Sequence, residues 1–226
     1  IDKKIQRIEK QAKTGDAKFK KELAILQEYK KHLESGENAR TIEMDAEDKK
    51  AVADLQLLTA KPVIYVANVE ESALPAGNEH SEKLKEGVKN ENAEVVVVSA
   101  SIEAQIAELE DPDERAMFLG EYGLKESGLN KLIKAAYSIL DLITYFTAGV
   151  KEVRAWTIKK GWKAPQAAGV IHTDFEKGFI RAEVIKLTDY EKYKTEVACK
   201  EAGKMSVEGK EYVVSDGDIM HFRFNV

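Results

Sequence analysis

Two short polar segments in this sequence have residue types that could contact a nucleotide base. Asn68-Val69-Glu70-Glu71 follows an apolar run at residues 63–67, and Ser99-Ala100-Ser101 follows a second apolar run at residues 94–98. An asparagine side chain carries a donor and an acceptor side by side, which suits the N6 and N7 edge of adenine. Ligands of open α/β sheets bind beyond the carboxyl ends of parallel strands, where we expect both segments. The simpler alternative is that Asn68 only caps a strand-to-loop turn.

A second candidate segment mixes basic and aromatic side chains. Lys159, Lys160 and Lys163 surround Trp162. Lysines contact RNA backbone and aromatic rings stack on bases, so these four residues are a candidate RNA contact. The alternative is a solvated hairpin tip with Trp162 folded onto a sheet, and both interpretations stay open.

The sequence contains no recognisable motif for phosphoryl transfer. No segment matches the phosphate-binding pattern G-x-x-x-x-G-K-S/T, and Gly203-Lys204-Met205-Ser206 lacks both the first glycine and a serine directly after the lysine. Without a phosphate loop or an acidic magnesium ligand, this chemistry lacks its main electrostatic groups. His172 and Asp174 have no accompanying nucleophile, so we interpret them as part of a turn. We therefore predict no catalytic residues, and the four scattered histidines indicate no metal site.

Composition describes a chain that can bury a core. Of its 226 residues, 43% are hydrophobic and 33% are charged, and no apolar run approaches the roughly 18 residues of a membrane span. The single cysteine, Cys199, allows no internal disulfide, which favours a reducing, cytoplasmic setting. The net charge of -5 is concentrated in residues 51–141, with 8 basic and 17 acidic side chains. The two ends are nearly balanced and carry local basic clusters that suit an anionic partner.

Residues 1–34 are predicted to form two helices, because apolar side chains recur there at helical spacing. Ile1, Ile5, Ile8 and Ala12 lie four, three and four residues apart, as in a coiled-coil seam. Gly15 suits the left-handed residue after a helix and Asp16 can cap the next one. A seam through residues 19, 23, 26 and 33, with Lys30 as its polar interruption, completes a predicted antiparallel hairpin. A third helix is predicted over residues 45–58.

The middle of the chain alternates strand and helix. Strands are predicted at residues 63–67 and 94–98 with a helix at 79–89 between them, which implies a parallel pair with a crossover. Helices are predicted at residues 101–109, 112–121 and 128–141. Two strands are too few for a stable open sheet, so this half-sheet needs further strands or leaves an exposed edge.

From residue 142 the pattern changes to short strands separated by turns. Strands are predicted at residues 145–146, 152–157, 182–186, 212–214 and 218–224, with helices at 165–170 and 189–202. A small mixed sheet crossed by a helix is the β-grasp pattern.

Three long segments carry a family resemblance. They are residues 144–157 (TYFTAGVKEVRAWT), residues 164–182 with APQAAG and IHTDFEKGFIRA, and residues 217–226 (GDIMHFRFNV). The chain resembles the Obg-like ATPases of the YchF family over essentially its whole length. The resemblance implies a helical hairpin insert at residues 1–44, the second part of a G domain at 45–141 and a TGS domain at 142–226. The implied fold is α/β: a partial, Rossmann-like P-loop NTPase half-sheet, the coiled-coil insert, and a ubiquitin-like β-grasp domain.

The resemblance also implies a nucleotide preference. The family replaces the guanine-recognising N-K-x-D motif by N-x-x-E, and Asn68 and Glu71 take its first and fourth positions. An aspartate at the fourth position accepts hydrogen bonds from guanine N1 and N2, and losing it relaxes discrimination against adenine. The Ser99-Ala100 turn resembles the last G motif. The implied base-binding residues are Asn68, Val69, Glu71, Ser99 and Ala100.

The family uses ATP and magnesium, and its members associate with ribosomes. Its phosphate loop, switch regions and magnesium ligands would lie upstream of residue 1. We therefore expect that a molecule consisting of these 226 residues does not hydrolyse ATP and keeps at most weak base contacts. The expected partner is the ribosome or RNA, with no membrane contact, and the expected location is the cytoplasm. The alternative is a self-sufficient RNA- or protein-binding adaptor built on the TGS domain.

Overall fold

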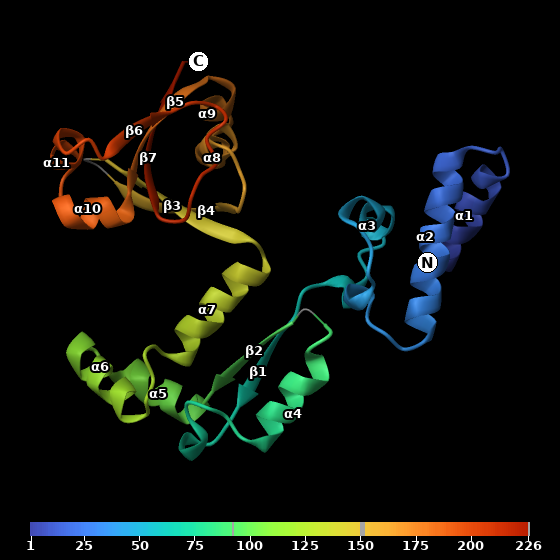
Figure 1. The fold of residues 1–226 in the computed structure, drawn as a ribbon, viewed down its shortest axis with the longest axis horizontal. Helices are drawn as coiled ribbons and strands as arrows, with labels where there is room; N and C mark the ends of the chain where they lie inside the picture. Colours follow the sequence, from blue (N-terminus) through green and yellow to red (C-terminus); the bar gives the residue numbers. More distant parts are fainter. Residues whose placement is uncertain (92, 150–151, 226) are drawn as a thin grey trace. The chain divides into compact units, whose positions relative to one another are not determined.

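The computed structural model describes residues 1–91, 93–149 and 152–225, and it divides into two compact units, Ile1–Ile139 and Leu140–Val226 (Figure 1). Residues 150, 151 and 226, which belong to two of the segments that carry the resemblance, lie outside the described residues. The domain limits at residues 44 and 141 stay a prediction.

The first unit begins with the predicted helical hairpin. Helices α1 (Asp2–Ala12) and α2 (Ala17–Glu34) flank a turn in which Gly15 has a left-handed φ of 90° and the Asp16 carboxylate accepts from the Lys18 N–H at 2.8 Å. The prediction that Lys30 occupies the seam was wrong. Tyr29 is buried instead, while the Lys30 ammonium pairs with Asp2 at 2.6 Å. The buried residues of α2, Ile25, Leu26 and Tyr29, follow the 3.6-residue period of one helix face.

Helix α3 (Ala46–Ala53) is capped by Asp45 as expected but ends five residues before the predicted limit. Gln56 has a φ of 46°, which a helix cannot accommodate. Short 3₁₀ turns, η1 (Ala39–Thr41) and η2 (Leu58–Ala60), lie on either side of α3. Lys4 ties α1 to the end of α3, because its mostly buried ammonium donates to the Ala51 carbonyl at 2.6 Å and pairs with Asp54 at 2.5 Å.

The rest of the first unit contains the predicted parallel pair. Strand β1 (Ile64–Asn68) pairs in parallel with β2 (Glu94–Val98), and the register runs from Ile64–Glu94 to Asn68–Val98. Helix α4 (Glu79–Val88) makes the crossover, and η3 (Glu71–Ala73) follows β1. The chain then forms α5 (Ala100–Glu108), α6 (Pro112–Glu121) and α7 (Gly128–Ile139).

Helix α7 approaches β2 closely at Gly128. A Cβ atom at this position would lie 2.6 Å from a methyl carbon of Val98, so only glycine fits. The Glu103 carboxylate accepts from the Gly128 N–H at 2.6 Å and from the Leu129 N–H at 3.1 Å, and thereby caps α7. These contacts fix α7 and α5 to the end of β2.

The second unit is a five-stranded mixed sheet. Its strands are β3 (Leu142–Ala148), β4 (Val153–Lys159), β5 (Phe179–Lys186), β6 (Met205–Glu208) and β7 (Asp218–Phe224), in the order β4-β3-β7-β5-β6. Strands β3 and β7 are parallel and the other neighbours are antiparallel. The helices are α8 (Ala164–Ile171), α9 (Thr173–Lys177), α10 (Leu187–Tyr193) and α11 (Glu196–Glu201). The predicted mixed sheet with helices beside it is confirmed.

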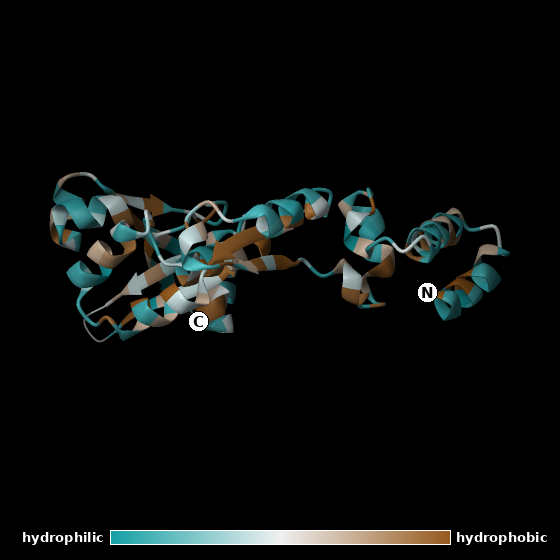
Figure 2. Cartoon of the chain, turned by 90° about the horizontal axis from the view of Figure 1, so that it is seen from below, coloured by the Kyte–Doolittle hydropathy of each residue, from teal (hydrophilic) through white to brown (hydrophobic). Residues whose placement is uncertain are grey.

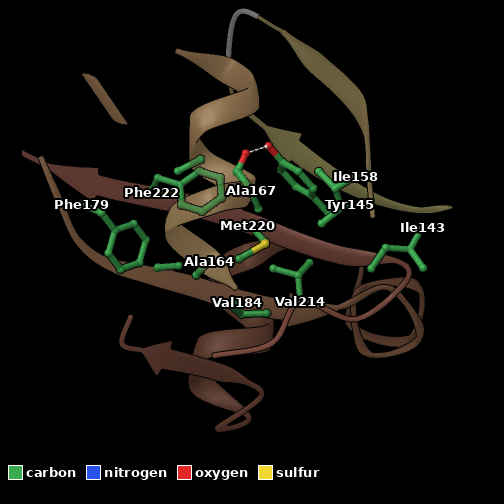
Figure 3. Close-up of a cluster of buried hydrophobic side chains, with 12 residues drawn as sticks. Ile143, Tyr145, Ile158, Ala164, Ala167, Phe179, Val184, Val214, Met220 and Phe222 are labelled. Atoms are coloured by element: carbon green, nitrogen blue, oxygen red, sulfur yellow. Dashed lines mark hydrogen bonds between the residues drawn. The ribbon is translucent and has the colours of Figure 1, made fainter. Parts of the chain in front are cut away.

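The core of this unit lies between the sheet and α8 (Figure 3). Tyr145 is completely buried, and its hydroxyl donates to the Ala167 carbonyl of α8 at 2.9 Å. Burial raises the pKa of Tyr145. Because side chains alternate along a strand, Phe146 faces the opposite side, where it packs on a second cluster formed by Ile185, Cys199 and Ile219. Figure 2 shows hydrophobic residues interleaved with hydrophilic ones along the helices, as expected of elements with one buried side.

Candidate nucleotide-base site

The two polar segments predicted from the sequence meet at one edge of the β1–β2 sheet. Asn68 is the last residue of β1, and Ser99 follows β2 directly. The Asn68 Oδ1 atom accepts a hydrogen bond from the Ala100 N–H at 2.9 Å. Parallel register brings the two strand ends together, and this bond then joins the end of β1 to the first turn of α5.

Glu71 is held at the same edge. The Ser101 hydroxyl donates to Oε1 of Glu71 at 2.5 Å, across 30 residues of sequence. Ser101 belongs to the predicted polar segment, but no role was predicted for it. The only sequence signal is a hydroxyl residue in the first turn of the helix that follows Ser99.

These residues line an open hollow of about 730 Å³. Asn68, Glu71 and Ala100 are exposed to it, whereas Val69 and Ser99 are buried. The Val69 N–H donates to the Val98 carbonyl at 2.8 Å, so Val69 contributes to the shape of the hollow through its backbone. The complete lining is Asn68, Val69, Glu70, Glu71, Ser72, Ser99, Ala100 and Ser101.

The Asn68 and Glu71 side chains offer one donor group and one acceptor atom to a ligand. Among the described residues, Nδ2 of Asn68 and Oε2 of Glu71 have no hydrogen-bond partner, while the other polar atom of each side chain is occupied. An amide donor beside a carboxylate acceptor can bind the polar edge of a planar base. In the described part of the chain, no group of three or more His, Cys, Asp or Glu side chains could hold a metal ion. The geometry of the described site is therefore compatible with binding the polar edge of a base.

The candidate RNA-contact residues lie in the second unit and are only partly available. Trp162 is half-buried against the core of the unit, and the Lys163 ammonium pairs with Glu211 at 2.5 Å. Lys159 and Lys160 are exposed. The structure thus brings these four residues together in one turn but leaves only two of them open to a partner.

His172 and Asp174 form the expected local turn. The His172 Nδ1 atom accepts from the Asp174 N–H at 3.2 Å and so caps the short helix α9. Cys199 is buried in the smaller core cluster. Within the described ranges, no helix is both long enough and apolar enough to cross a membrane.

The chain is similar to curated proteins over its whole length. It is 54% identical to the "Ribosome-binding ATPase YchF" of Bacillus subtilis and 52% identical to the protein of the same name from Escherichia coli O157:H7. Both alignments include 100% of this chain and 62% and 61% of the relative, respectively. The family model YchF-GTPase_C, described as a protein of unknown function, matches residues 142–225.

Solved structures have the same fold. The YchF GTPase of Schizosaccharomyces pombe matches 98% of this chain with a TM-score of 0.79 and 36% identity, and the match includes 62% of that chain. A GTP binding protein from Pyrococcus horikoshii matches 90% of this chain with a TM-score of 0.53 and 18% identity, a likeness of fold alone. The chain spans about three fifths of the length of the relatives it matches. It belongs to the YchF family and corresponds to the C-terminal portion of that family's proteins.

Proposed function

We propose that this chain supplies the base-binding side of an ATP site in a ribosome-associated, ATP-hydrolysing P-loop protein. The observation that carries the proposal is the hydrogen bond from the Ala100 N–H to Asn68, which places the first residue of the N-x-x-E motif against the Ser99-Ala100 turn. The proposed base contacts are made by Asn68, Val69, Glu71, Ser99 and Ala100. The names of the bacterial relatives, which describe a ribosome-binding ATPase, support it.

The contact between Ser101 and Glu71 favours adenine over guanine. A guanine offers two adjacent donors, N1–H and the N2 amine, to a carboxylate that can accept with both oxygens. Here Oε1 of Glu71 already accepts from Ser101, so Oε2 is the only oxygen of this carboxylate with its full accepting capacity left for a ligand. Adenine has a single amine, N6, and its neighbouring N7 can accept from Nδ2 of Asn68. The Schizosaccharomyces pombe relative is named a GTPase, whereas the nucleotide that we propose for this chain is ATP.

ATP and magnesium are the proposed cofactors of the complete protein. The base contacts described here would orient the adenine, while the phosphates and the metal would be held by the part of the relatives that this chain does not span. We infer that the 226 residues alone bind ATP weakly and do not hydrolyse it. Exposed apolar side chains on the half-sheet and on α7 support this division, because Val66 of β1 and Leu129 of α7 are 46% and 58% exposed.

We further propose that the second unit is a TGS domain, that α1 and α2 are a coiled-coil insert, and that the protein works in the cytoplasm. The β-grasp strand order of the second unit and the seam of the hairpin support these assignments. The second candidate function is an RNA- or protein-binding adaptor. It is favoured by one observation, namely that the second unit closes a core of its own.

The test is a titration of the ¹⁵N-labelled chain with millimolar adenosine and, separately, guanosine. We expect adenosine to shift the amide signals of Asn68, Ala100 and Ser101, with smaller shifts for guanosine. Asn68→Ala should abolish these shifts, whereas Asn130→Ala, at an exposed position of α7, should leave them intact. Equal shifts with both nucleosides would contradict the adenine preference. No shift with either would favour the adaptor.

A further inference from the structure

The turn between α1 and α2 carries four exposed lysines, Lys10, Lys13, Lys18 and Lys20, which we call the basic tip. Lys10 and Lys13 lie in and just after the last turn of α1, and Lys18 and Lys20 lie in the first turn of α2. The helical rise of about 1.5 Å per residue therefore keeps all four within roughly one helical turn of the connection.

The charges of the basic tip are not neutralised within the hairpin. Among the described residues, none of its four ammonium groups has a carboxylate within 4.0 Å, whereas Lys4, Lys21 and Lys30 of the same hairpin are all paired. The only acid between Lys10 and Lys20 is Asp16. Its carboxylate accepts from the Lys18 N–H as a helix cap, so its position is fixed by the backbone. The tip therefore has an excess of three positive charges.

The basic tip has no apolar anchor. Ala12 is buried and Phe19 is half-buried against the hairpin core, and in the described structure the first exposed large hydrophobic residue along the chain is Leu58. The helices at this end of the chain are mainly hydrophilic in Figure 2. Protein–protein contacts depend on buried aromatic or apolar anchors and are poor in lysine. Contacts to phosphates need only accessible cations.

We infer that the basic tip binds the phosphodiester backbone of RNA. Its cations are all lysines, which act as point charges and lack the fork-shaped donor set with which arginine recognises guanine. Binding is therefore independent of base sequence and strongly dependent on salt. The inference rests on the proposed ribosome association, for which it names the contacting surface and the chemistry of the partner.

The lysines around Trp162 are a weaker candidate for the same role. Lys163 is paired with Glu211 and Trp162 is packed on the core, so only Lys159 and Lys160 remain open there. The basic tip presents four free cations in residues 10–20, twice the number in residues 159–163.

The test measures binding of the chain to two fluorescein-labelled RNA duplexes of different sequence by anisotropy over a series of salt concentrations. The tip variant carries Lys10→Gln, Lys13→Gln, Lys18→Gln and Lys20→Gln. The control variant carries the same change at four exposed, unpaired lysines elsewhere, Lys125, Lys177, Lys200 and Lys210, and so has the same net charge. Glutamine has nearly the helix propensity of lysine, and circular dichroism confirms that each variant is folded.

We expect equal affinities for the two duplexes. In the tip variant, the slope of log K against log salt should fall by about 3 to 4, since each phosphate contact contributes roughly 0.9. Affinity at low salt should fall at least about tenfold, and the control variant should lose much less. A third variant with arginine at all four tip positions should bind at least as tightly as the original chain.

Three results would overturn the inference: equal losses in tip and control variants, no measurable RNA binding by the original chain, or tighter binding of polyglutamate than of RNA. The adenosine titration on the same samples separates this failure from failure of the proposed function. Adenosine shifts that persist without RNA binding at the tip overturn the RNA contact and leave the base site in place.

Discussion

The two sheets of the molecule differ in how far they are buried. One belongs to the second unit, and the other to the α/β half of the first unit, residues 64–139. The five-stranded sheet packs a buried cluster on each face, one around Tyr145 and one around Ile219. In the two-stranded sheet no residue of β1 is buried, and Val96 is the only buried residue of β2. One region completes its own core, while the other presents apolar surface of the kind that a further segment or chain covers. The candidate base site lies in the region with the exposed apolar surface.

One carboxylate from each region shows the same difference in burial and in hydrogen bonding. Asp218 of β7 is fully buried and accepts from the Lys186 ammonium at 2.6 Å, the Tyr212 hydroxyl at 2.6 Å and the Ser215 N–H at 2.9 Å. Glu71 is exposed and accepts one hydrogen bond from Ser101. A fully bonded buried carboxylate stabilises one packing, whereas an exposed one with a free oxygen remains able to bind a ligand.

The largest expected effect comes from the closed core of the second unit. Tyr145→Ala should lower the free energy of unfolding of this unit by about 3–5 kcal/mol, because it removes a fully buried ring and its bond to Ala167. Both tryptophans, Trp156 and Trp162, lie in this unit, so their fluorescence during urea unfolding reports on it. Tyr145→Phe is the control and should cost about 1 kcal/mol. A loss of less than about 1 kcal/mol in the alanine variant would show that Tyr145 is not part of a closed core.

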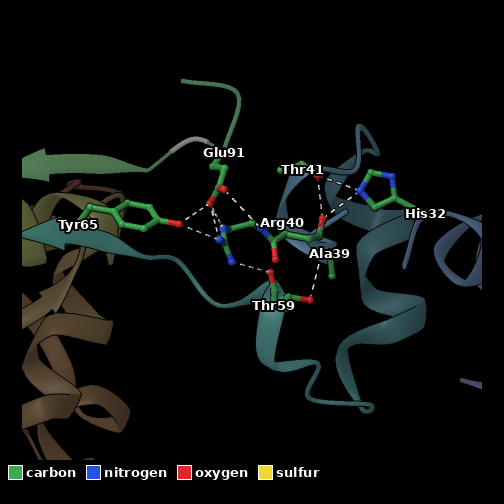
Figure 4. Close-up of polar contacts among 8 residues, drawn as sticks. His32, Ala39, Arg40, Thr41, Thr59, Tyr65 and Glu91 are labelled. Carbon is green, nitrogen blue, oxygen red and sulfur yellow. Dashed lines mark hydrogen bonds and ion pairs between the residues drawn. The ribbon is translucent and has the colours of Figure 1, made fainter. Parts of the chain in front are cut away.

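The next effect concerns a polar cluster within the first unit (Figure 4). Glu91, after α4, accepts from Arg40 of η1 and from the Tyr65 hydroxyl at 2.9 Å. Arg40 also donates to the Thr59 carbonyl at 3.2 Å. The hydrogen bond from Arg40 holds the pKa of Glu91 below its usual value, against the opposing effect of burial. The cluster joins the helical segment around η1 to strand β1.

The sign of its pH dependence follows from this shift. A carboxyl group with a lowered folded pKa stabilises the fold above its unfolded pKa, and this stabilisation is lost as the pH falls through the folded value. Glu91→Gln should therefore destabilise the first unit by about 1–2 kcal/mol at neutral pH, and the difference should shrink at acidic pH. Hydrogen exchange of the β1 amides measures this difference in stability between the original chain and the variant. Glu86→Gln, in an exposed pair with Lys89, is the control. A difference that grows with acidification would contradict the assignment.

The sequence predicted the elements whose signals are local. The hairpin, the parallel pair and α8 have periodic apolar residues and clear breakers, and the structure confirms them. Strand β6 was missed, because residues 205–208 are ordered by pairing with β5, from Ala182–Glu208 to Ile185–Met205. The strand predicted at residues 212–214 is only an isolated bridge between Lys163 and Val213. Both errors arise from partners distant in sequence, which no local pattern contains.

The same distinction applies to the site. The neighbourhood of Asn68 and Ala100 could be predicted, since both follow apolar runs and parallel strands bring their carboxyl ends together. The bond between Ser101 and Glu71 could not, because it depends on the angle at which α5 leaves β2 and on the position of η3. Gly128 had no recognisable role until the approach of α7 to Val98 was known.

The smallest expected effect concerns α7, and it tests whether residues 64–139 present apolar surface that a further segment would cover. Leu129 and Ile133 are one helical turn apart and are 58% and 48% exposed. Replacing both by glutamine should change the stability of this chain by less than about 0.5 kcal/mol per residue, because substitutions at exposed positions disturb few contacts. Thermal unfolding followed by circular dichroism measures this, and Ala135→Gln, at a buried position of the same helix, is the destabilising control.

If the region is completed by further chain, the same double change should destabilise the longer protein by several kcal/mol, since two apolar side chains would then be lost from a buried surface. Equal effects in both molecules would mean that this face of α7 is ordinary solvated surface, and the contrast between a closed unit and an open one would no longer hold.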